Sequence, residues 1–177
     1  MRKFLDSLYL GSGVLAAVFL AGIGVLMLVQ IIGRELAYQV RGADDLTAWF
    51  CAASAFLPLA HTFKRGELVR VGLLLERLRP AARRRAELFC LGLAAVFVGY
   101  MAVSVTRFVY QSWEINDVAQ GMLPLPMWIP QSSFALGVII LFIAIADELV
   151  LVIGRHTPTY VLAEEERLAS GDFSEIL

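Results

Sequence analysis

Residues 9–32, YLGSGVLAAVFLAGIGVLMLVQII, form a run without a single charged side chain. A helix needs about 20 apolar residues to cross the roughly 30 Å hydrocarbon core of a bilayer, and this run is long enough. It exceeds the roughly 7–15 apolar residues of a secretory signal, so we interpret it as an uncleaved helix. Three more apolar stretches follow at residues 46–63, 88–106 and 128–153. The sequence therefore predicts an all-α integral membrane protein with four transmembrane helices.

The composition argues against a soluble protein. Hydrophobic residues make up 59% of the 177 residues, and helices of a soluble bundle would need a polar face that these stretches lack. The basic middle of the chain suits anionic lipid headgroups, and nothing else indicates a nucleic-acid partner. We assign residues 1–155 to a four-helix membrane domain. Residues 156–177 are polar and acidic, and we expect them to form a mobile cytoplasmic tail.

Basic residues in the connections predict the orientation, because Lys and Arg are enriched in cytoplasmic loops while acidic residues contribute little. The connection at residues 64–87 contains most of the basic residues, and the one at residues 107–127 contains only Arg107. We therefore expect the 64–87 connection and both termini to be cytoplasmic. This orientation places every tryptophan at the outer membrane–water boundary, where indole rings are favoured, namely Trp49, Trp113 and Trp128.

Two local features refine this prediction. Residues 64–80, KRGELVRVGLLLERLRP, indicate a short cytoplasmic helix at the membrane surface, which Pro80 ends. Pro58 lies inside the second apolar stretch, and its nitrogen carries no hydrogen to donate to the carbonyl of Ser54. We therefore expect a kink in the second helix, with a neighbouring group bonding the freed carbonyl.

Ionisable residues inside the hydrocarbon usually mark function in a membrane bundle. Asp147 and Glu148 lie about 30 Å along the helix from Trp128, so we expect ordinary interfacial carboxylates at the cytoplasmic boundary. His61 lies deeper, either hydrogen-bonded within the bundle or ligating a haem or metal. The ligand interpretation needs a partner, and His156 lies past the last helix. We find no catalytic constellation and expect no cofactor or metal in this chain.

Four stretches, in order, carry a family resemblance. They are QIIGR at residues 30–34, DDLTAWF at 44–50, HTFKRGELVRVGLL at 61–74 and LPMWIPQSSFALG at 125–137. Over residues 10–153, the chain resembles the small membrane subunit of tripartite ATP-independent periplasmic (TRAP) transporters. In that family an acidic pair before leucine, a basic-Gly-Glu turn and a Pro-x-Trp motif recur with this spacing.

The resemblance implies a function without enzymatic activity in the inner membrane of a bacterium. In this family the small subunit assembles with a large membrane subunit that holds the substrate and sodium sites. A periplasmic substrate-binding protein delivers an organic anion, and the sodium gradient drives its import. The small subunit would be a scaffold, so any sodium coupling is expected in its partner.

Residues at the helix ends are candidates for positioning such a subunit against its large partner or against membrane lipid. Ordinary solvated helix ends are the alternative interpretation for each of them. The candidates are Arg34, Asp44, Asp45 and the boundary residues Trp49 and Trp128 on the outer side, with Arg65 and Glu67 on the inner side.

Two other classes of function stay open at this point. An accessory subunit of a membrane-bound oxidoreductase would be revealed by a haem absorption band in the purified complex. A stand-alone small transporter of the multidrug type would need a carboxylate deep in the first helix, and residues 9–32 contain none.

Overall fold

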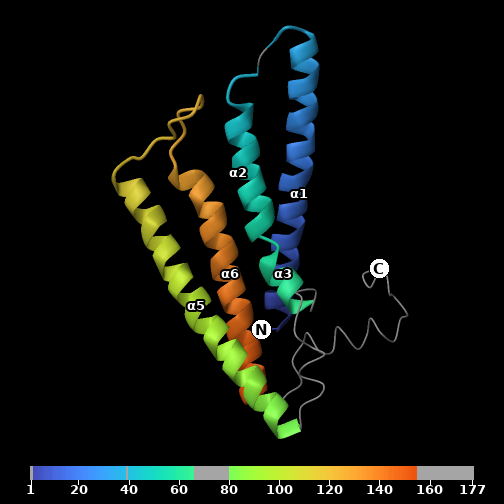
Figure 1. Ribbon diagram of the computed structural model, residues 1–177, viewed down its shortest axis with the longest axis vertical. Helices are drawn as coiled ribbons and strands as arrows, with labels where there is room; N and C mark the ends of the chain where they lie inside the picture. The colour runs from blue at the N-terminus through green and yellow to red at the C-terminus, as the bar shows by residue number, and fades with distance from the viewer. Residues whose placement is uncertain (1, 39, 66–79, 155–177) are drawn as a thin grey trace, which may run out of the picture.

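The computed structural model describes residues 2–38, 40–65 and 80–154 (Figure 1). These residues form α1 (Arg2–Glu35), α2 (Ala43–Phe56), α3 (Leu59–Lys64), α5 (Pro80–Glu114) and α6 (Trp128–Ile153). Outside the helices, the described residues contain one isolated antiparallel bridge, between Val118 and Pro126. The surface helix expected at residues 64–80 and the tail at residues 156–177 lie outside the described residues.

Four helical segments are long and apolar enough to cross a membrane, which confirms the all-α prediction with four such helices. In the described part of the chain they are Leu5–Glu35, Ala43–Lys64, Arg84–Glu114 and Trp128–Ile153. The first and third helices extend past the apolar stretches at 9–32 and 88–106. Apolar residues mark only the part of a helix that meets hydrocarbon, and backbone hydrogen bonding continues into the polar zone beyond it.

The helices lie side by side in a row, in the order α5, α6, α2 with α3, and α1 (Figure 1). α6 packs against α5 on one side and against α2 and α3 on the other, and α1 packs on α2 and α3. A helix inside the row is more buried than one at its edge. One third (33%) of the most apolar window of α6 is buried, but only 6% of that of α1. The molecule is therefore a layer of helices with two open faces.

The main apolar core lies toward one end of the layer along the helix axes, the end at which α3 ends and α5 begins. Buried residues of α1, α3, α5 and α6 meet there, namely Tyr9, Ala60, Phe63, Leu91, Ala144, Ile145 and Val152. A smaller cluster joins α1 to α2 through Ala16, Ala53 and Leu57. The four spans are thus held together most firmly at one end of the layer.

Pro58 interrupts the second span, as the sequence predicts. α2 ends at Phe56 and α3 begins at Leu59, and the Pro58 carbonyl accepts hydrogen bonds from the Thr62 backbone N–H (3.0 Å) and hydroxyl (3.3 Å). α6 approaches this break closely, because a Cβ placed on Gly137 would lie 2.5 Å from the Phe56 carbonyl oxygen. The missing side chain of Gly137 therefore permits this contact.

The opposite end of the layer carries two connections, which we call the outer connections: residues 36–42, described except for residue 39, and residues 115–127. Two residues beyond the ends of α1 and α5, the chain has a residue at positive φ, Ala37 (54°) and Asn116 (51°). Beyond each, a backbone N–H bonds back five residues, from Tyr38 to Gly33 (2.8 Å) and from Asp117 to Ser112 (2.9 Å). This pairing is the Schellman helix end, and it turns the chain sharply back over the layer.

Candidate functional site

Asp45 joins the 115–127 connection to the start of α2. It stands in the first turn of α2, and its Oδ2 accepts hydrogen bonds from the backbone N–H groups of Met122 (2.9 Å) and Leu123 (3.4 Å). The adjacent Gly121 lies so close that a Cβ there would collide with this carboxylate. A charged acceptor strengthens such bonds, so Asp45 fixes the 115–127 connection to the start of α2.

Asp44 in the first turn of α2 and Arg34 in the last turn of α1 lie near each other, at the edge of one hollow. Gln30 of α1 donates from Nε2 to Asp44 Oδ1 over 3.2 Å, which ties the two helices together near the surface. Arg34 is exposed in the last turn of α1. Gln30, Arg34 and Asp44 line an open hollow of about 340 Å³, together with Tyr38 and Val40.

The structure separates the two tryptophan candidates. Trp49 is half-buried on α2, one helical turn beyond Asp45. Trp128 is the first residue of α6 and lines an apolar hollow between α5 and α6 together with Trp113. Neither lines the hollow around Arg34. The outer candidates are therefore spread over three helices, with the polar ones and Trp49 on α1 and α2 and with Trp128 on α6.

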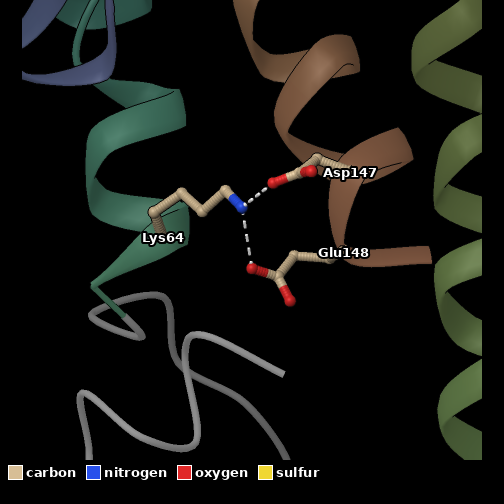
Figure 2. A network of polar contacts seen from close by, with 3 residues as sticks. All are labelled: Lys64, Asp147 and Glu148. Atoms are coloured by element: carbon tan, nitrogen blue, oxygen red, sulfur yellow. Dashed lines mark hydrogen bonds and ion pairs between the residues drawn. The ribbon is translucent and has the colours of Figure 1, made fainter. Parts of the chain in front are cut away.

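A charged cluster connects α3 to α6 at the inner end, which is the end where α3 stops and α5 starts (Figure 2). Lys64 Nζ forms an ion pair with Asp147 and a second one, at 2.9 Å, with Glu148 Oε1. Glu148 is fully buried, whereas the Asp147 side chain is 28% exposed. The Lys64 ammonium also lies over the ring of Tyr9 on α1, 5.4 Å from its centroid. One cation thus links three helices.

This cluster corrects the expectation for Asp147 and Glu148. They were expected as ordinary interfacial carboxylates, but Glu148 is inside the protein and paired. Sequence reasoning placed Arg65 and Glu67 at the inner side and passed over Lys64. The sequence feature that could have identified Lys64 is the pair of adjacent carboxylates near the end of an apolar helix, because a buried carboxylate requires a cation at the same depth in the membrane.

The remaining inner candidates have simpler surroundings. Arg65 caps α3, and its backbone N–H bonds to the His61 carbonyl at 3.0 Å. Glu67 lies outside the described residues. His61 is half-buried with its ring against Gly13 of α1, where a Cβ would lie 3.3 Å from His61 Cγ. Arg84 donates to the last carbonyls of α6, at Val152 (3.4 Å) and Ile153 (3.3 Å).

These groups hold parts of the chain together. Asp45 and Lys64 each join segments far apart in the sequence, one at each end of the layer. In the portions of the chain that the structure describes, no cluster of three or more His, Cys, Asp or Glu side chains could hold a metal ion. The polar groups near these sites are therefore suited to holding helices and loops in fixed positions.

Comparison with protein families agrees with the resemblance noted in the sequence. Residues 23–155 match the family described as tripartite ATP-independent periplasmic transporters, DctQ component. No curated protein matches the chain. The matched range begins within α1 and contains all of α2, α3, α5 and α6.

Proposed function

The chain belongs to the DctQ family, the small component of tripartite ATP-independent periplasmic transporters, and we propose that it is the scaffold subunit of such a transporter. In this proposal it assembles with a large membrane subunit that contains the substrate and sodium sites. A periplasmic binding protein delivers an organic anion to this pair, and the sodium gradient drives import. The chain itself carries out no chemical reaction.

The observation that supports a scaffold is the use of charged side chains at both ends of the layer. Asp45 bonds to the 115–127 connection, and Lys64 bonds to Asp147 and Glu148. A transport site needs polar groups that are free to bind a solute or an ion within the membrane. Here these groups fasten one part of the subunit to another, which suits a rigid body against which a partner moves.

We propose that both termini face the cytoplasm of a bacterium and that the protein lies in the inner membrane. The basic connection at residues 64–87 supports this orientation through the positive-inside rule. The inner end of the layer also contains Lys64 and Arg84, which bond to the last turns of α6. Trp113 and Trp128 lie at the opposite end, as expected for an outer boundary.

The shape of the layer is consistent with assembly. Large apolar side chains of α1 are more than half exposed along its length, for example Val18, Leu20, Val25 and Leu28. Lipid covers such a surface as readily as protein does, so exposure alone does not identify the partner helix. The layer provides a wide exposed apolar surface, and the contacts of Asp45 and Lys64 hold its helices together at the two ends.

Reconstitution tests this proposal. The periplasmic binding protein would be purified from the same organism, and mass spectrometry of the ligand it retains would identify the solute. Both membrane subunits would then be placed in vesicles with an inward sodium gradient, and uptake of that solute measured. We expect uptake only when this chain is present. Equal uptake with the large subunit alone would contradict the scaffold function.

A further inference from the structure

An apolar groove runs along the seam between α5 and α6. It consists of two adjoining hollows of about 600 and 340 Å³, both of which Thr106 and Ile139 line. The larger hollow lies over Gly99, where a Cβ would lie 2.9 Å from the ring of Phe142, and extends past Val103 to Arg107. We call these two hollows the α5/α6 groove.

The larger hollow has the length of one lipid tail. Its lining residues on α5 run from Ala95 to Arg107, which is about 18 Å of helix at 1.5 Å per residue. Half of a roughly 30 Å hydrocarbon core, the part that one leaflet fills, is about 15 Å. Apart from the hydroxyl of Tyr100, and Thr106 and Arg107 at its outer end, the α5 side chains that line this hollow are apolar or absent, as at Gly99. The hollow is therefore a surface for hydrocarbon with a charge at one end.

Arg107 supplies that charge. It is the only Lys or Arg in the sequence between Arg85 and Arg155, and its side chain is exposed. Within the described residues it forms no ion pair. A guanidinium at the edge of the hydrocarbon favours an anionic oxygen group, and phosphate matches its forked geometry.

The smaller hollow has the character of a membrane interface. It lies beyond Arg107 and is lined by the aromatic residues Tyr110, Trp113 and Trp128. Tyrosine and tryptophan are favoured at the level of lipid headgroups. Hydrocarbon surface, a cation and an aromatic rim follow one another in the order found along a phospholipid, from tail to phosphate to headgroup.

We propose that the α5/α6 groove binds one phospholipid, with an acyl chain in the larger hollow and its phosphate group at Arg107. A packed helix from another protein would fill the hollow too, but an apolar helix would leave the guanidinium without an anion. The charge therefore favours a lipid as the occupant. This inference does not depend on the proposed transport function.

Native mass spectrometry of the full chain, with any protein that copurifies, tests the binding. Dioleoylphosphatidylglycerol and dioleoylglycerol, which lacks the phosphate, would be offered in detergent. We expect one phosphatidylglycerol retained by the wild type. Arg107→Gln should lower its occupancy at least fivefold without changing that of dioleoylglycerol, while Arg41→Gln, an exposed outer arginine, should leave both unchanged.

A second pair of variants tests the hollow itself. Val103→Trp would fill it, whereas Val18→Trp places the same side chain on the exposed face of α1. We expect at least fivefold lower occupancy of both lipids with Val103→Trp alone. Occupancy equal to that of Val18→Trp, or no effect of Arg107→Gln, would overturn the proposal.

Cross-linking in intact membranes distinguishes lipid from protein. A photoreactive amino acid at position 103 should give a product larger by the mass of one phospholipid. A product that contains a second polypeptide would show that the groove is a helix-docking surface and would overturn the lipid assignment.

Discussion

Glu148 is the one charged side chain that is fully buried in the described part of the chain. Lys64 Nζ lies 2.9 Å from its Oε1. A buried ion pair contributes little net stability compared with an apolar pair, but removing one member leaves an uncompensated charge inside the protein. Lys64 therefore compensates the charge of Glu148, and the pair links α3 to α6.

Replacing Lys64 with methionine should destabilise the protein by about 3 kcal/mol, because the Glu148 carboxylate would stay buried without this cation. Asp147→Asn should cost about 1 kcal/mol or less, since that carboxylate is partly exposed. Thermal unfolding in mild detergent, followed by tryptophan fluorescence, would measure both. Equal shifts in the two variants would contradict the assignment of the main constraint to Glu148.

Asp45 has the corresponding role at the outer end, with backbone groups as its partners. Asp45→Asn keeps the shape but removes the charge that strengthens the bonds to Met122 and Leu123. We expect a loss of about 1–2 kcal/mol and faster proteolysis within the 115–127 connection. Asp44→Asn is the matched control, because its bond to Gln30 is single and exposed. Identical proteolysis of the two variants would contradict this role.

The α2/α3 break is the main irregularity at the level of elements. Pro58 removes one backbone donor, and the chain resumes as α3 after a single turn. α6 packs across this point, with the rings of Phe56 and Phe134 4.2 Å apart and Gly137 against the Phe56 carbonyl. The break and the glycine together allow α2 and α6 to pack at close range.

A methyl group at Gly137 should therefore push α2 away from α6. We expect Gly137→Ala to lower stability by about 1–3 kcal/mol, the usual cost of overpacking. Gly24→Ala on α1 is the control, because a Cβ there meets nothing within 4 Å and alanine favours a helix. Chemical or thermal unfolding in detergent compares them, and a neutral Gly137→Ala would show that the helices separate without cost.

The positions of the helices could be predicted from the sequence better than the contacts between side chains. Long apolar runs predicted the four spans, and Pro58 predicted the interruption, because each of these signals is local. The partner of Asp45 was not predictable, since the backbone N–H groups of Met122 and Leu123 carry no residue identity. Lys64 and Glu148 are 84 positions apart, and no local pattern joins them. The candidate residues were therefore named without the groups that they contact.

In the molecule as a whole, the arrangement of the helices in a single row determines how much apolar surface stays exposed. A layer with α1 and α5 at its edges exposes many apolar side chains. Asp45, Lys64 and Glu148 are among the charged groups that hold its parts together. Such a body needs lipid or protein on every side. This architecture is suited to a static support in a larger membrane assembly.

The orientation of the layer can be tested with single cysteines. With Cys51 and Cys90 replaced by serine, a cysteine at Gln120 in the outer connection should react with a membrane-impermeant maleimide on intact spheroplasts. A cysteine at Ser170 should react only after the membrane is permeabilised. The opposite pattern would show that the termini are outside and would reverse the proposed topology.

We propose that this chain is the small, scaffolding subunit of a two-part membrane unit. The most direct test of this claim is purification of the tagged chain from its native membrane in mild detergent, with cross-linking in intact membranes beforehand. We expect to recover a much larger polytopic membrane protein in about equal amount, cross-linked to this chain. Recovery of this chain alone, with only copies of itself in the cross-linked products, would contradict the claim.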